Sequence, residues 1–281
     1  MGGTAAPASP AGEPVNDDRR YRAAALIQAA AHRTGAEMTA AFVLHRADGT
    51  APSTEFRRHA FGAHDPFASH REIAWQGPDA MAAGRLSLVG EFELAGFPHI
   101  ETIVVVDGEL TLTAHGAAPR VLGPREGAVI GAGSALRLAA RAPVRLVFCA
   151  AACAAPTRRG VLALRAEADF KPSATLPPEV LLGPAPQCRS DNVFDDDAAA
   201  YCAGIWDSTP YHRIVRPHRV NEFMFLLAGG VRLAAPDGSV LSLTAGDALF
   251  LPRGTPVGWE SSERVSKFYV VQNVAASTAR D

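Results

Sequence analysis

The sequence predicts an all-β protein that contains two related β domains. Short runs rich in Val, Leu, Phe and Thr begin near residue 39, and Gly, Pro, Asp and Asn separate them, with the spacing of about 8–12 residues that is typical of a sandwich or barrel. Asp107-Gly108 and Asp237-Gly238 each stand between two such runs, where the glycine accepts the positive φ that a hairpin turn requires. A repeated spacing of glutamate and glycine residues indicates two copies of one domain.

The composition supports this fold class and argues against several kinds of protein. The 281 residues suffice for two domains of about 100–150 residues each, and 48% of them are hydrophobic, enough for a sizeable core. A net charge of −2 provides no basic field, so we expect neither nucleic acid nor a membrane as a partner. We expect a cytoplasmic protein, because the sequence shows no secretory signal, no long apolar run and no CxxC pair among its four cysteines.

The first 37 residues are predicted to be an extension ahead of the β domains. Residues 1–15 are mostly small residues and Pro, a composition that favours disorder. Asn16-Asp17-Asp18 could cap a short helix that runs to about His32.

The repeat sets the expected domain boundaries. In two places a glutamate is followed by glycines seven and thirty-two residues later; these are Glu101, Gly108 and Gly133 in the first copy, and Glu222, Gly229 and Gly254 in the second. Two agreeing spacings within similar strand-turn-strand segments indicate homologous domains. The sequence therefore predicts an N-terminal extension, a first barrel, an inter-barrel linker and a second barrel, over residues 1–37, 38–155, 156–199 and 200–281.

The spacing Glu-x6-Gly followed by Gly-x5-Pro-x-Gly resembles the paired motifs of the cupin superfamily. Residues 200–272 resemble more narrowly the ureidoglycine aminohydrolase and ethanolamine-utilisation cupins, through Trp206, Gly246-Asp247, Pro252-Arg253-Gly254, Trp259 and Lys267. Residues 84–150 carry a degraded version. The resemblance implies a bicupin, in which two double-stranded β-helix barrels of the RmlC-like jelly-roll type follow one another in one chain.

The resemblance also implies where a metal would bind, and the residues match only partly. A typical metal-binding cupin supplies three histidines and one glutamate; the second copy matches with His218 and Glu222 but has Arg216 and Val257 at the other two positions. The first copy keeps Glu101 and has Ala95, Phe97 and Leu136. Because a permanently charged arginine repels a cation, we expect either no cofactor or a divalent metal (Mn, Zn, Fe or Ni) at an incomplete site, with Tyr211 or His212 as added donors.

A metal-free pocket is the alternative interpretation of the same residues. In the closing strand Val265, Lys267 and Tyr269 share one face, which we expect to point inward, so that Lys267 contacts Glu222. We predict Glu222 and Lys267 as catalytic residues. The predicted ligand-binding residues are Tyr211, His212, Arg216, His218, Trp259 and Tyr269. A purely structural ion pair capped by Trp259 stays open as a competing interpretation.

Two functions are compatible with these residues. The first is an enzyme acting on a small polar metabolite (an amine, an amino acid or a ureido or carboxylate compound), similar to an aminohydrolase or an isomerase, with Glu222 as general base. The second is a non-catalytic ligand-binding, accessory or sensor protein. A small molecule is the expected partner in both cases, and a homo-oligomer stays open. His59, His64 and His70 are expected to be solvated loop residues.

Overall fold

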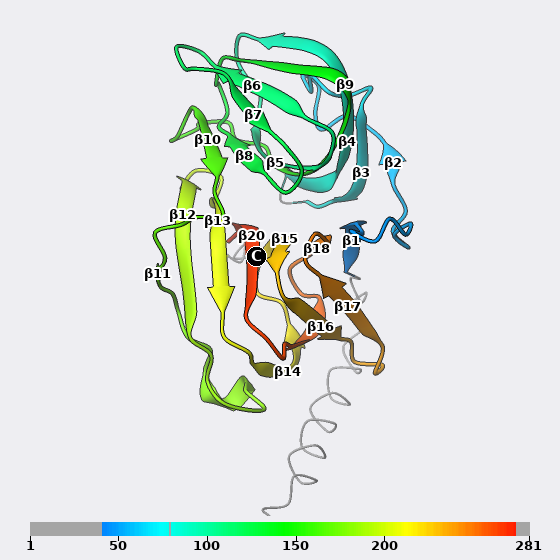
Figure 1. The fold of residues 1–281 in the computed structure, drawn as a ribbon, viewed down its shortest axis with the longest axis vertical. Coiled ribbons are helices and arrows are strands. Elements are labelled where there is room, and N and C mark those ends of the chain that lie inside the picture. The colour runs from blue at the N-terminus through cyan, green and yellow to red at the C-terminus, as the bar shows by residue number, and fades with distance from the viewer. Residues whose placement is uncertain (1–40, 79, 274–281) are drawn as a thin grey trace, which may run out of the picture. The chain divides into compact units, whose positions relative to one another are not determined.

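The computed structural model describes residues 41–78 and 80–273, and these residues form antiparallel β-strands with a single 3-10 turn at Pro178–Val180 (Figure 1). The expected all-β class is therefore confirmed. The helix expected between Asn16 and His32 lies outside the described residues. No described helix is long and apolar enough to cross a membrane.

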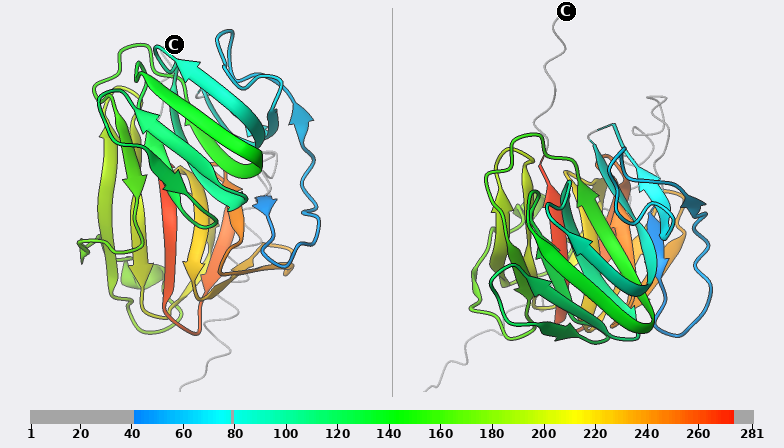
Figure 2. Two further views of the ribbon diagram at one scale, coloured as in Figure 1. Left: turned by 45° about the horizontal axis from the view of Figure 1, so that its top comes forward. Right: turned by 90° about the horizontal axis from the view of Figure 1, so that it is seen from above.

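The strands of the first copy form one sheet, in the spatial order β10-β8-β5-β9-β4-β3-β2, with β6 and β7 attached beside β9. Their bounds are β2 (Arg57–Arg58), β3 (Arg71–Gln76), β4 (Met81–Leu94), β5 (Ile100–Asp107), β6 (Leu110–Ala114), β7 (Arg120–Leu122), β8 (Gly127–Ile130), β9 (Leu136–Ala151) and β10 (Val161–Leu164). The two long strands β4 and β9 pair over most of their length and bend this sheet around its own interior. Figure 2 shows these strands in cyan and green.

The strands of the second copy form two sheets. The larger follows the order β1-β18-β15-β20-β13-β12-β11 and the smaller follows β14-β19-β16-β17. The larger consists of β1 (Phe42–His45), β11 (Lys171–Pro172), β12 (Cys188–Asp196), β13 (Tyr201–Ser208), β15 (Asn221–Ala228), β18 (Ala248–Leu251) and β20 (Val265–Gln272). The smaller consists of β14 (His212–Pro217), β16 (Gly230–Ala234), β17 (Val240–Thr244) and β19 (Pro256–Glu260).

The two glutamates of the repeat occupy equivalent places in these sheets. Glu101 on β5 lies opposite Ile130 of β8 and Ala150 of β9. Glu222 on β15 lies opposite Leu251 of β18 and Val271 of β20. Each partner of Glu222 lies 121 residues after the corresponding partner of Glu101, and the two glutamates are separated by the same number. The predicted equivalence of Glu101 and Glu222 is therefore confirmed.

Alternation along each strand divides the apolar side chains among three clusters. On β5, Ile103 and Val105 face the interior of the first copy, whereas Val104 belongs to a cluster shared by both copies. On β15, Met224 and Leu226 face a third cluster between the two sheets of the second copy. Phe223 and Phe225 join the shared cluster. Because neighbouring side chains of a strand point to opposite faces, β5 and β15 each place one set of side chains in the interior of their own copy and the other set in the shared cluster.

The glycines that follow the two glutamates both adopt a left-handed conformation. Gly108 has φ of 82° and Gly229 has φ of 73°, values that L-residues other than Gly rarely adopt. A Cβ atom at Gly229 would also collide with the backbone carbonyl of Arg264. Turn conformation and close packing therefore both require glycine at this position of the repeat.

Two segments lie elsewhere than the expected domain boundaries place them. β1, which precedes the first copy in sequence, pairs with β18 of the second copy, with Phe42 opposite Phe250. The segment 156–199, expected as a linker, contains β10, β11 and β12. β12 pairs with β13 along its length and so extends the larger sheet of the second copy. These strands cover sheet edges whose backbone groups would otherwise be unpaired.

Candidate functional site

The interior of the second copy holds an ion pair between two neighbouring strands of the larger sheet. Glu222 of β15 and Lys267 of β20 sit on the inner faces of these strands, as the alternation with Val265 and Tyr269 predicts. Lys267 Nζ donates to Glu222 Oε1 at 2.8 Å and to Met224 Sδ at 3.0 Å. The predicted contact between Lys267 and Glu222 is confirmed.

Two tryptophans complete the surroundings of the ammonium group. Lys267 Nζ lies 4.8 Å from the ring centroid of Trp206 and 5.2 Å from that of Trp259. The Trp206 ring meets Trp259 edge-on at 86°, and Tyr211 stacks on the other side of Trp259 with centroids 5.6 Å apart. An ammonium over aromatic faces gains cation–π attraction, which increases when water is excluded. A carboxylate, a thioether and two indoles thus hold the Lys267 ammonium.

His218 lies beside the other oxygen of the glutamate. Its Nε2 lies 2.8 Å from Glu222 Oε2. Burial by itself raises the pKa of Glu222, but the nearby Lys267 ammonium and the His218 imidazole outweigh burial and bring the pKa well below its ordinary value. Glu222 is therefore an ionised carboxylate at neutral pH, and both of its oxygens have a partner.

A cavity of about 300 Å³ opens beside this ion pair. Its polar wall includes Glu222, Lys267 and Tyr269, together with Ser173 and Ser190. The Ser173 hydroxyl is buried and has no hydrogen-bond partner among the described residues. The Tyr269 hydroxyl donates to Asn192, and burial raises the pKa of this phenol above its ordinary value, so it stays protonated at neutral pH.

The structure brings some of the predicted site residues together and separates others. Glu222, Lys267 and Tyr269 line the cavity, His218 contacts Glu222, and Trp259 and Tyr211 pack around Lys267. His212 and Arg216 lie on β14, in the smaller sheet, and no contact described in the structure joins them to Glu222 or Lys267.

Ser173 and Ser190 line the cavity and were missed because they lie in the segment interpreted as a linker. Predicting a strand over Cys188–Asp196 would have placed Ser190 in a sheet and made it a candidate site residue.

The residues present do not fit a transition metal. Divalent metals of this kind require three or more nitrogen, oxygen or sulfur donors in defined geometry. Within residues 41–78 and 80–273, no three or more His, Cys, Asp or Glu side chains form a group that could hold one. The Lys267 ammonium also lies 2.8 Å from Glu222 Oε1, where its positive charge opposes a second cation.

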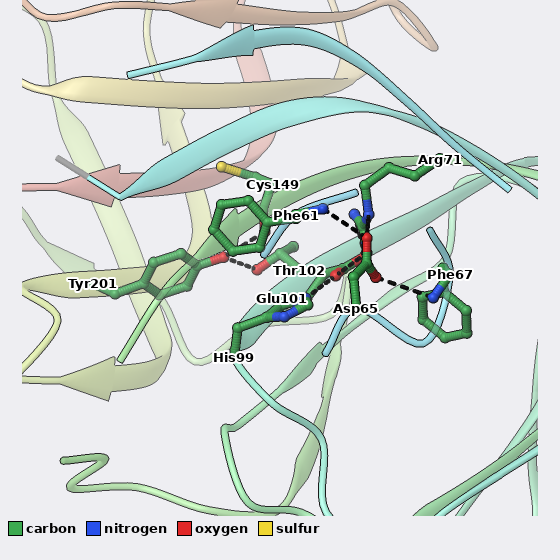
Figure 3. A network of polar contacts seen from close by, with 9 residues as sticks. All are labelled: Phe61, Asp65, Phe67, Arg71, His99, Glu101, Thr102, Cys149 and Tyr201. Atoms are coloured by element: carbon green, nitrogen blue, oxygen red, sulfur yellow. Dashed lines mark hydrogen bonds and ion pairs between the residues drawn. The ribbon is translucent and has the colours of Figure 1, made fainter. Parts of the chain in front are cut away.

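The first copy buries its glutamate against an arginine instead. Glu101 binds Arg71 of β3 through both oxygens, Oε2 to Nη2 at 2.9 Å and Oε1 to Nη1 at 3.2 Å, and His99 Nε2 lies 2.6 Å from Oε2 (Figure 3). Asp65 binds the adjacent edge of the same guanidinium, with Arg71 Nε at 2.7 Å and Nη2 at 3.0 Å. The guanidinium also lies 4.2 Å from the Phe148 ring centroid. Arg71, Asp65 and Glu101 are fully buried, so this network fills its interior.

Both copies therefore combine a largely buried glutamate with a histidine and a side-chain cation, and in the second copy a cavity lies beside them. Arg71 was not predicted, because it precedes Glu101 by thirty residues and belongs to neither motif of the repeat. The burial of an arginine in a short strand gives no local signal in the sequence.

Comparison with known proteins agrees with this architecture. The EutQ-like cupin domain family matches residues 197–269. The chain is similar to the crystal structure of a protein of unknown function of the DUF861 family from Pseudomonas syringae pv. tomato str. DC3000, with 38% sequence identity, coverage of 82% of this chain and 98% of that chain, and a TM-score of 0.79. This protein belongs to the cupin superfamily.

A more distant similarity concerns the fold alone. The cupin 2 conserved barrel domain protein from Leptotrichia buccalis is 13% identical, with coverage of 71% of this chain and 86% of that chain and a TM-score of 0.51. Comparison with curated proteins found no match.

Proposed function

We propose that the protein is a bicupin whose second barrel binds a small polar metabolite beside Glu222 and Lys267, without a transition metal. The two-barrel arrangement is supported by the equivalent registers of Glu101 and Glu222. It is also supported by separate apolar interiors in the two copies. Each barrel would bury its own interior and pack against the other through the shared cluster.

The observation that carries the binding proposal is the cavity beside an ion pair in the second copy. A volume of about 300 Å³ is at the lower end for small-molecule sites, which suits a ligand the size of an amino acid. Glu222 provides acceptor oxygens, whereas Lys267 and the Ser173 hydroxyl provide donors. Such a wall favours a ligand with both kinds of group, such as an amino acid, an amine or a ureido or carboxylate compound.

Catalysis with Glu222 as general base is the second candidate, and the electrostatics favour binding over it. General-base catalysis works best when the pKa of the base lies near the operating pH. Lys267 and His218 hold the pKa of Glu222 far below that range. An aminohydrolase-like reaction would require the ligand to displace Lys267 from Glu222 and so to raise this pKa.

Thermal-shift and metal measurements test the proposal together. We expect an amino acid, amine or ureido compound to raise the melting temperature of the wild-type protein but not of Glu222→Gln. Glu260→Gln, an exposed glutamate paired with Arg232, is the matched control and should respond like the wild type. We also expect substoichiometric metal in the purified protein and no effect of a chelator on the ligand shift. Stoichiometric metal whose removal abolishes the shift would contradict the proposal.

A further inference from the structure

A second and larger cavity lies away from Glu222, between the segment that begins with β1 and strands β3, β4 and β9. Its volume is about 710 Å³. Figure 2 shows β1 and the blue segment after it running along one side of the strands of the first copy. Four arginines from four different segments line this basic cleft: Arg46, Arg58, Arg85 and Arg145. Glu72 is the one carboxylate among the described lining residues.

Two of these guanidinium groups are anchored through a single nitrogen. Arg85 binds Glu72 with Nε at 2.5 Å, and Arg145 binds Asp107 with Nε at 3.2 Å. For the part of the chain that the structure describes, no acceptor is recorded for the Nη groups of either arginine. Each guanidinium is thus held in place while its two outer nitrogens remain available. These outer nitrogens form the planar fork that binds carboxylate or phosphate oxygens in pairs.

The other two arginines differ in how firmly they are held. Arg46 Nη1 donates to Asp247 Oδ2 at 3.0 Å and to the Ser242 carbonyl at 2.7 Å, which leaves Nε and Nη2 without a described acceptor. Arg58 on β2 is exposed and has no ion pair or hydrogen bond among the described residues. The cleft therefore combines an arginine held by two hydrogen bonds at a single nitrogen with an exposed arginine that has no partner among the described residues.

The charge of the cleft contrasts with that of the whole chain. Four guanidiniums face one carboxylate in the lining, although the protein carries a net charge of −2. Burial, and then the positive charge of Arg145, lower the pKa of His45 below its ordinary value, although Asp247, Asp107 and Asp48 act in the opposite direction. Asp107 and Asp247, which pair with Arg145 and Arg46, raise the nearby carboxylates to three, so the four guanidiniums leave a small local excess of positive charge that favours an anion.

We propose that the basic cleft binds a small organic anion that carries at least two acidic oxygen groups, as a phosphomonoester or a dicarboxylate does. One such group would lie between Arg85 and Arg145, and the other would be reached by Arg46 and Arg58. This site is separate from the proposed metabolite site at Glu222 and Lys267, and its occupancy does not depend on that proposal.

Titration calorimetry with inorganic phosphate, succinate and citrate, at an ionic strength kept constant with NaCl, tests the proposal. We expect saturable binding with a dissociation constant below about 1 mM for at least one of these anions. Binding of phosphate alone would assign a phosphate-bearing ligand, and binding of succinate or citrate alone would assign a di- or tricarboxylate. Absence of saturable binding of all three would overturn the proposal.

Matched substitutions locate the site. Arg58→Gln and Arg145→Gln should each weaken binding about tenfold, because each removes charge-assisted hydrogen bonds. Arg120→Gln removes an exposed arginine with no described partner, and Arg232→Gln removes one that is paired singly with Glu260; both lie outside the cleft and should leave the affinity unchanged. An equal loss in the control variants would show diffuse charge attraction and would refute a defined site.

Discussion

At the scale of single residues, each copy buries most of a glutamate side chain. A carboxylate taken out of water requires a partner of opposite charge and filled hydrogen bonds. Arg71 provides both for Glu101 through two parallel hydrogen bonds, and Asp65 binds the adjacent edge of the guanidinium. Lys267 provides the opposite charge for Glu222 and donates a single hydrogen bond to it. The lysine is a compact donor, and a cavity lies beside it in the second copy.

Replacing Lys267 with Met should therefore destabilise the protein strongly. Lys267→Met keeps most of the unbranched side chain and leaves the nearly buried Glu222 carboxylate without its cation, which costs about 3–5 kcal/mol of unfolding free energy. Urea unfolding at pH 7, followed by tryptophan fluorescence, measures this cost. Lys171→Met changes the other lysine of the chain, which is exposed on β11, and should cost little. Similar losses in both variants would show that the Lys267–Glu222 contact contributes nothing special.

The same ion pair predicts a pH dependence. Burial raises the pKa of Glu222, but Lys267 and His218 outweigh burial and lower this pKa below its ordinary value of 4.5 in the folded state. Stability from Glu222 should therefore be fully present above about pH 4.5 and should be lost as the pH falls toward the folded pKa. The difference in unfolding free energy between wild type and Glu222→Gln, measured by urea titration from pH 7 to pH 3, should shrink below that pH. A difference that stays constant would contradict the lowered pKa.

At the scale of elements, the turns after β5 and β15 determine how each glutamate strand folds back. Gly229 combines a left-handed backbone with close contact to the carbonyl of Arg264, whereas Gly238 has a similar φ of 84° and open space around it. Gly238→Ala should cost about 1 kcal/mol through backbone strain alone, and Gly229→Ala about 3 kcal/mol, because the packed backbone must also move. Thermal and urea unfolding of the two variants measure the difference. Equal costs would show that the close approach is irrelevant.

The local elements could be predicted from the sequence, and the long-range ones could not. Alternation within β20 correctly predicted that Lys267 points toward Glu222, because side-chain direction in a strand depends on neighbouring residues only. The repeat correctly predicted that Glu101 and Glu222 are equivalent. The partner of Glu101 was missed, since Arg71 lies on a separate strand with no motif of its own. Pairings between distant strands, such as that of β1 with β18, depend on the whole fold and have no local signature.

At the scale of the whole molecule, polar and apolar contacts join the two copies. Tyr201 of β13 donates to the Cys149 carbonyl of β9 at 3.0 Å and lies 2.7 Å from the Thr102 hydroxyl of β5 (Figure 3). These groups are buried beside the shared cluster. The copies are therefore joined by a core of the same kind as those inside them.

We expect the two copies to unfold in one cooperative transition. Tyr201→Phe keeps the ring and leaves the Cys149 carbonyl and the Thr102 hydroxyl without this partner, which should lower the unfolding free energy by about 1–3 kcal/mol. The midpoint of the single transition should shift without splitting. Urea unfolding, monitored in parallel by tryptophan fluorescence and far-UV circular dichroism, tests this expectation. Two separate transitions in the wild type would show that the copies are independent.

The pairing of β1 with β18 has a consequence for the order in which the chain acquires structure. A growing chain leaves the ribosome with Phe42 emerging about 200 residues before its partner Phe250. During this interval the first copy can complete its own sheet, but the edge of β1 that pairs with β18 has no partner. β18, which is made after the first copy, is thus the strand that pairs with β1, and separating the two repeats into different chains would leave β18 without this partner on one side.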